Sequence, residues 1–88
     1  MEIVFLPQAD EDREYWKQSG NNQVMKRITA LLNDILEHPF TGIGKPEPLK
    51  ENLQGLWSRR ITDQHRIIYS VNEGKLYVYA LRYHYTKK

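Results

Sequence analysis

The pattern of apolar and polar positions divides the chain into a helical first half and a strand-rich second half. A short apolar run at residues 2–6 predicts a strand, and the acidic residues at 10–12 mark the start of a helix that ends near Gly20. Asn21 or Asn22 can cap a second helix, which is expected to stop before Pro39 because a residue preceding proline disfavours the helical conformation. The apolar residues of this second helix recur at helical spacing and predict a core stripe: Val24, Ile28, Leu31, Leu32 and Ile35.

The second half predicts three strands after an ordered loop. Residues 41–52 contain two glycines and two prolines and indicate the loop, and strands are expected at 56–62, 66–71 and 75–83. A tight turn at Asn72-Glu73-Gly74 joins the last two strands. This order implies an α+β fold, with two N-terminal helices packed on a mainly antiparallel four-stranded sheet. Alternation in the strand expected at 66–71 puts Ile67 and Tyr69 on one side of the sheet and Arg66 and Ile68 on the other. It does not decide which side meets the helices.

Length and composition narrow the class of protein. Eighty-eight residues predict one domain spanning 1–88. No apolar run approaches the ~20 residues needed to span a bilayer, and the first residues do not resemble a signal peptide, so a cytoplasmic protein without membrane contact is expected. The absence of cysteine excludes disulfides and thiolate metal sites, and the three histidines are widely spaced. No metal or other cofactor is therefore expected.

Positive charge is concentrated in the second half of the chain. Residues 1–40 carry four Lys/Arg and seven Asp/Glu, a net charge of −3, whereas residues 41–88 carry nine and four, a net charge of +5. This asymmetry indicates a polyanionic partner for the second half. A solubilising surface with a chance excess of cations explains the charge alone equally well.

The candidate chemical groups lie in three separated pieces of this basic half: GKPEPLK at 44–50, WSRRI at 57–61 and RYHY at 82–85. Glu47 lies between two prolines that stiffen its backbone, and such positioning suits a general base. Arg59 and Arg60 are adjacent on a predicted strand and point to opposite faces, so at most one of them joins a given site. Arg66, on the next strand, adds a guanidinium that binds phosphate.

The third piece supplies a proton-transfer group and aromatic side chains. His84 lies between Tyr83 and Tyr85, and histidine is the usual acid or base at neutral pH. Tyrosines here, and Trp57, can stack on unpaired bases. Taken singly, each of these residues also has a structural explanation: an exposed loop acid, surface arginines, a surface histidine or core aromatics.

The combination is more specific than its members. The segment GKPEPLKENLQGLWSRRITDQHR at 44–66 and the RYHY at 82–85 closely resemble the YoeB/Txe family of bacterial toxins within the RelE-like superfamily. The resemblance extends over essentially the whole chain and implies the RelE-like microbial ribonuclease fold. Family members typically end at the His-Tyr pair, whereas this chain continues with Thr86, Lys87 and Lys88. The two added lysines are expected to extend the contact with RNA.

The resemblance implies a ribosome-dependent messenger-RNA endonuclease of a type II toxin–antitoxin pair. Its implied partners are messenger RNA and the 70S ribosome, a YefM-like antitoxin, operator DNA only through the antitoxin complex, and optionally a second copy of the chain. The family's catalytic residues fall on Glu47, Arg66 and His84. Its RNA- and phosphate-binding residues fall on Lys50, Arg60 and Tyr85.

The implied chemistry needs no metal, because RNA carries its own nucleophile in the 2′-hydroxyl group. We expect Glu47 to accept the 2′-OH proton, the cations to stabilise charge at the phosphorus, and His84 to protonate the leaving 5′-oxygen. A competing interpretation is a non-catalytic module that binds RNA or the ribosome, or an antitoxin co-repressor. Binding alone, however, requires no proton-transfer pair, and the chain retains Glu47, Arg66 and His84.

Overall fold

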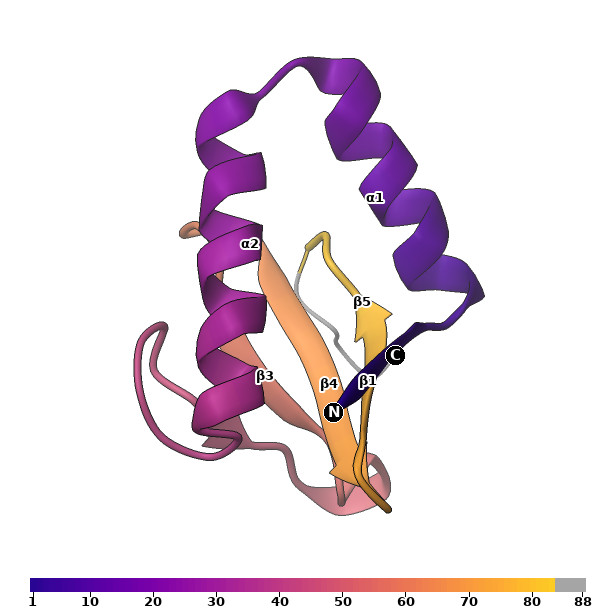
Figure 1. Cartoon of the computed structure of the whole chain (residues 1–88), viewed down its shortest axis with the longest axis vertical. Coiled ribbons are helices and arrows are strands. Elements are labelled where there is room, and N and C mark those ends of the chain that lie inside the picture. The colour runs from indigo at the N-terminus through magenta and orange to yellow at the C-terminus, as the bar shows by residue number, and fades with distance from the viewer. Residues whose placement is uncertain (84–88) are drawn as a thin grey trace.

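The protein is built from two helices and a sheet, and the structure, a computed structural model, describes residues 1–83. In chain order the elements are β1 (Glu2–Phe5), α1 (Pro7–Ser19), α2 (Asn22–Glu37), β2 (Glu47–Pro48), the short 3-10 helix η1 (Glu51–Leu53), β3 (Trp57–Arg60), β4 (Arg66–Asn72) and β5 (Lys75–Ala80). Both helices lie on the same side of the sheet, with α2 beside β3 and β4 and α1 towards β5 and β1 (Figure 1). The predicted α+β class is confirmed.

The sheet holds one more strand than the sequence predicted. Within residues 1–83 it has five strands, in the order β1-β5-β4-β3-β2. β1 runs parallel to β5, and every other neighbouring pair is antiparallel. The additional strand is β2, in which Glu47 and Pro48 pair with Ser58 and Trp57 at the edge. A strand of two residues next to prolines has no periodic pattern, so the segment was predicted as a loop.

Proline, glycine and asparagine define three of the four helix ends. Pro7 starts α1, and Gly20 ends it with a left-handed φ of 71°. The side chain of Asn21 caps α2 by accepting a hydrogen bond from the backbone N–H of Val24 at 3.1 Å. The predicted stripe of α2 is confirmed as core. Four of its members are buried, namely Val24, Ile28, Leu31 and Ile35, and the fifth, Leu32, is partly buried and packs against the core.

The turn between β4 and β5 is tight, as predicted. Asn72 pairs with Lys75, which leaves Glu73 and Gly74 as a two-residue loop. Their φ angles of 51° and 76° place both residues in the left-handed region. Positive φ at both central positions matches the twist of the flanking strands, so the hairpin forms without a longer loop.

Packing decides which side of the sheet meets the helices. Ile67 and Tyr69 of β4 have no exposed surface and belong to the same core as Leu31 of α2. Side chains alternate along a strand, so Arg66 and Ser70 point to the side away from the helices. The helix-free side of the sheet is called the open face below.

β5 ends at Ala80, whereas the sequence pattern predicted a strand through residue 83. Leu81 leaves the sheet because its N–H donates to Oδ2 of Asp12 at 2.8 Å and its carbonyl accepts the indole N–H of Trp16 at 3.0 Å. Both backbone groups of Leu81 therefore bond to α1 instead of a neighbouring strand. Asp12 and Trp16 lie far from Leu81 in the sequence, so the local pattern of apolar residues does not show that they bond to it.

Arg59 of β3 is fully buried on the helix side and connects several parts of the chain. Its guanidinium donates to the carboxylate of Asp34 in α2, and its Nε donates to the hydroxyl of Tyr69 in β4 at 3.1 Å. It also donates to three carbonyl groups in the connection after α2: His38, Thr41 and Ile43. A buried charge is tolerated only when it is paired and hydrogen-bonded, and here both conditions are met.

The connection between α2 and β2 fits closely around this guanidinium. Gly42 has a φ of 113°, and a Cβ there would lie 2.0 Å from a carboxylate oxygen of Asp34. Gly44 has a φ of 81°, and its Cβ would lie 2.7 Å from the side chain of Leu31. Glycine suits both positions, since another residue would be strained at these φ angles and its Cβ would force Asp34 or Leu31 to shift. The segment that leads into β2 therefore has a fixed course.

The pKa values of Asp34 and Tyr69, the two side chains bonded to Arg59, are shifted in opposite directions and by different causes. The hydrogen bond from Arg59, followed by the one from the backbone N–H of Ile43, lowers the pKa of Asp34 below its ordinary value of 3.8. Burial raises the pKa of Tyr69 above its ordinary value of 10.0. Asp34 is thus a carboxylate and Tyr69 a neutral hydroxyl near neutral pH.

We expect Arg59→Met to lower the free energy of unfolding by at least about 3 kcal/mol, because it leaves one carboxylate and several carbonyl groups without their donor. Arg60→Met, at the adjacent position on the open face, is the matched control and should cost less than about 1 kcal/mol. Urea unfolding followed by circular dichroism measures both. Equal midpoints for the two variants would show that Arg59 does not hold the fold together.

The lowered pKa of Asp34 predicts a pH-dependent stability. Its contribution is complete above the ordinary carboxyl pKa of 3.8 and is lost as the pH falls through the lowered folded value. The difference in unfolding free energy between wild type and Asp34→Asn should therefore stay constant from neutral pH to about pH 5 and shrink at lower pH. Asp10→Asn, which removes an exposed carboxylate paired with Arg13, is the control. A difference that persists unchanged into strong acid contradicts the expectation.

Candidate functional site

The strand register brings three of the sequence-predicted site residues to the open face. Glu47 pairs with Ser58, and Arg60 pairs with Arg66. Residues directly opposite in antiparallel strands project to the same side, and Ser58 and Arg60 are two apart on β3. Glu47, Arg60 and Arg66 therefore share the open face of three adjacent strands, β2, β3 and β4.

Glu47 lies on an exposed and stiff edge strand. Its side chain is exposed, and the neighbouring Pro46 and Pro48 have no N–H to pair. Beyond β2 the backbone N–H of Leu49 donates to the carbonyl of Leu56 at 2.8 Å, which continues the pairing with the segment before β3. The carboxylate is thus carried on extended backbone, as the two prolines predicted.

Arg60 and Arg66 form the cationic end of the open face. They face each other where β3 ends and β4 begins, and both are half-buried. Like charges directly opposite destabilise a sheet, and an anion bound between them would relieve this repulsion. The Nε of Arg60 is buried and has no hydrogen-bond partner within residues 1–83. A buried donor without a partner costs free energy, which an acceptor oxygen of a ligand would recover.

The backbone beside Arg60 is also held in place. Its N–H donates to the carbonyl of Gly44 at 2.7 Å, and its carbonyl accepts from the guanidinium of Arg27 in α2 at 3.2 Å. The loop before β2 and the second helix therefore both position this strand end.

The remaining predicted residues are placed less fully. Lys50 is exposed and precedes η1, two residues after the end of β2. His84 and Tyr85 lie outside the described residues. Tyr83, the last described residue, has an exposed side chain.

The open face also contains residues that the sequence analysis did not select. Ser58 is almost completely buried between the strand positions of Glu47 and Ile68. Farther along, the hydroxyl groups of Ser70 and Tyr79 lie 3.2 Å apart. A serine and a tyrosine in a strand have no pattern that separates a site from ordinary sheet packing, so only the register identifies them.

His65 is a further residue that lies outside the predicted site. It precedes Arg66 in the β3–β4 connection, and its Nδ1 accepts the backbone N–H of Tyr83 at 2.8 Å. The feature of the sequence that could have pointed to His65 is its position next to Arg66, a candidate site residue. Its partner, however, is eighteen residues away and on another segment.

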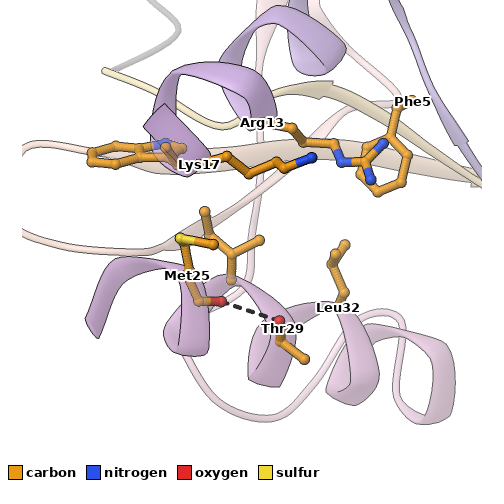
Figure 2. A pocket seen from close by; sticks show the side chains of 8 residues that line it. Phe5, Arg13, Lys17, Met25, Thr29 and Leu32 are labelled. Carbon is orange, nitrogen blue, oxygen red and sulfur yellow. Dashed lines mark hydrogen bonds between the residues drawn. The ribbon is translucent and has the colours of Figure 1, made fainter. Parts of the chain in front are cut away.

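An apolar groove lies on the helix side of the sheet, between α1 and α2 (Figure 2), and none of the predicted site residues lines it. Its volume is about 370 Å³. It is lined by residues of β1, α1 and α2: Phe5, Arg13, Trp16, Lys17, Met25, Ile28, Thr29 and Leu32. The guanidinium of Arg13 lies 4.1 Å from the ring centre of Phe5 at one end. Among residues 1–83, its lining contains no carboxylate or histidine.

Among residues 1–83, neither helix is long and apolar enough to cross a membrane.

Comparison with known proteins agrees with the motifs and the fold. Residues 5–85 match the family model described as YoeB-like toxin of bacterial type II toxin-antitoxin system. The toxin YoeB of Escherichia coli K12 is 44% identical over 85 residues, which cover 97% of this chain and 100% of that protein.

Solved structures are similar over the same extent. A YoeB/ParE toxin from Agrobacterium tumefaciens superposes with a TM-score of 0.90 at 39% identity, covering 97% of this chain and 100% of that one. A YoeB–YefM complex and a YoeB dimer, both from Staphylococcus aureus, have TM-scores of 0.87 and 0.88 at 43% and 42% identity, each covering 97% of this chain and 98% of theirs. The chain therefore belongs to the family of YoeB-like toxins of bacterial type II toxin–antitoxin systems.

Proposed function

We propose that this toxin is an endoribonuclease that cleaves messenger RNA in the A site of the 70S ribosome. The observation that carries the proposal is the shared open face of Glu47, Arg60 and Arg66, which joins one exposed carboxylate to two guanidinium groups. Guanidinium groups bind phosphate, and a nearby carboxylate can accept a proton from a ribose hydroxyl. Membership in the YoeB-like toxin family supports a toxic activity.

In the proposed reaction, Glu47 removes the proton from the 2′-hydroxyl group. The 2′-oxygen forms a bond to the adjacent phosphorus while the bond from phosphorus to the 5′-oxygen breaks. His84 transfers its proton to the departing 5′-oxygen, so the products are a 2′,3′-cyclic phosphate and a free 5′-hydroxyl. Arg66, together with Arg60 and Lys50, stabilises the added charge on the phosphoryl oxygens.

The buried Nε of Arg60 supports a role in binding phosphate. Within residues 1–83 it has no acceptor, and a phosphate oxygen would supply one. Tyr85 is proposed to orient a base or the scissile phosphate, and the lysines at 87 and 88 to extend the contact with RNA. The excess of cations in residues 41–88 favours association with this polyanion.

The proposed partners follow from the family and its known complexes. We propose that a YefM-like antitoxin neutralises the toxin and connects it to operator DNA, since a related YoeB has been solved with YefM. A related YoeB also forms a dimer, which supports self-association of this chain. Messenger RNA and ribosomes place the proposed activity in the cytoplasm.

We expect Glu47→Gln to lower the rate of cleavage by at least about 100-fold, because glutamine cannot accept the 2′-hydroxyl proton. Primer extension on messenger RNA in a translating extract measures the new 5′ ends. Glu73→Gln, in the exposed β4–β5 turn, is the matched control and should retain the wild-type rate. Unchanged cleavage by Glu47→Gln refutes the general-base role, and wild-type protein that stalls ribosomes without any cut selects a binding module instead.

Arg66→Gln should slow single-turnover cleavage by about 100-fold while ribosome binding changes little, since its charge acts mainly in the transition state. Arg66→Lys should recover only part of the rate, because an ammonium group cannot reproduce the bidentate contact. Arg13→Gln, on the helix side, controls for the loss of one positive charge. A loss of ribosome binding that accounts for the whole defect would reassign Arg66 to docking.

A further inference from the structure

The short segment after β5 leads from the sheet to His84, and its backbone is held at both ends. At its start, Leu81 is bonded to Asp12 and Trp16 of α1, as described above. Asp12 is itself buried and also accepts a hydrogen bond from Gln8 at 2.9 Å. The helix therefore fixes where the segment leaves the sheet.

At its far end, Tyr83 is held by two consecutive residues, the last of the β3–β4 connection and the first of β4. Its N–H donates to Nδ1 of His65 at 2.8 Å, and its carbonyl accepts the backbone N–H of Arg66 at 3.2 Å. Tyr83 has a φ of 58°, which is the left-handed region that non-glycine residues rarely adopt. Such a conformation persists only where its surroundings impose it, and these two hydrogen bonds do so.

The ring of His65 is itself packed in position. It meets the ring of Trp16 edge to face, with centroids 4.9 Å apart, and the ring of Tyr83 at 5.2 Å. An imidazole can accept at Nδ1 only when it is neutral and carries its hydrogen on Nε2. The bond to Tyr83 therefore specifies one tautomer, and His65 acts here as an acceptor for the backbone.

We propose that His65 is a positioning residue whose Nδ1 holds Tyr83 in the left-handed conformation and thereby sets the direction in which the chain continues to His84. Its catalytic consequence rests on the proposed ribonuclease function. His65 and Arg66 are adjacent, so one corner of the sheet supplies a phosphate-binding guanidinium and also anchors the segment that carries the proposed acid. The corner thus couples the position of the Arg66 guanidinium to that of the proposed acid. Small displacements of catalytic groups strongly reduce reaction rates.

Two substitutions at position 65 separate the acceptor from the ring. His65→Leu removes the acceptor but keeps an apolar side chain against Trp16, whereas His65→Asn places an amide oxygen near the position of Nδ1. His38→Asn, at the exposed end of α2, is the matched control. The first readout is hydrogen exchange of the Tyr83 amide by NMR in the toxin alone. The second is single-turnover cleavage of ribosome-bound messenger RNA, with ribosome affinity measured separately.

We expect His65→Leu to speed exchange of the Tyr83 amide by at least about tenfold and to slow cleavage by about 10- to 100-fold. Ribosome affinity should stay within about twofold, since the ordering of the acid affects the chemical step and not docking. His65→Asn should restore most of both properties, and His38→Asn should change neither. This rescue by an acceptor distinguishes positioning from a general loss of stability.

Two results would overturn the inference. Either His65→Leu leaves Tyr83 exchange and cleavage at wild-type values, or His65→Asn is as defective as His65→Leu, which would assign the effect to ring packing. Wild-type protein that leaves ribosome-bound messenger RNA uncut refutes the proposed function, and the catalytic role of His65 with it. Wild-type cleavage together with an unaffected His65→Leu refutes the role of His65 alone.

Discussion

The buried guanidinium of Arg59 is the constraint around which this small fold is organised. A charge without solvent must be paired, and five groups supply its acceptors: Asp34, His38, Thr41, Ile43 and Tyr69. They come from α2, the connection that follows it, and β4. A domain of this size has a limited apolar core, so a single polar hub can determine how helix, loop and sheet fit together.

The hub on the helix side fixes the course of the residues that lead to the open face. The connection that wraps Arg59 passes through Gly42 and Gly44, where no side chain fits, and then pairs with β3 as β2. Glu47 is therefore positioned by contacts on the opposite side of the sheet from its own side chain. Arg59 and Arg60 are adjacent on β3 and therefore point to opposite sides of the sheet. Arg59 is buried on the helix side and stabilises the fold, whereas Arg60 lies on the open face.

The first helix performs the equivalent role for the end of the chain. Asp12 and Trp16 take the backbone of Leu81 out of the sheet, and the corner at His65 and Arg66 holds Tyr83 two residues later. The proposed base is thus carried on β2, and the segment that precedes the proposed acid is held separately, by α1 and by the corner at His65 and Arg66. The rigidity of each support depends on hydrogen bonds between distant segments, which suits groups that must stay in a set geometry.

The sequence by itself determined the fold class, both helices with their caps at Gly20 and Asn21, the β4–β5 turn, the motifs and the family. These depend on local periodicity, on glycine and asparagine chemistry, and on recognisable residue patterns. The start of α1 at Pro7, ahead of the acidic residues at 10–12, came from the structure. Only the tertiary structure decided that Glu47–Pro48 forms a fifth strand, that β5 stops at Ala80, and which side of the sheet is open. It also brought Glu47, Arg60 and Arg66 to one face and gave His65 its partner. These features arise from hydrogen bonds and burial between residues far apart in the chain, and a local pattern carries no record of such partners.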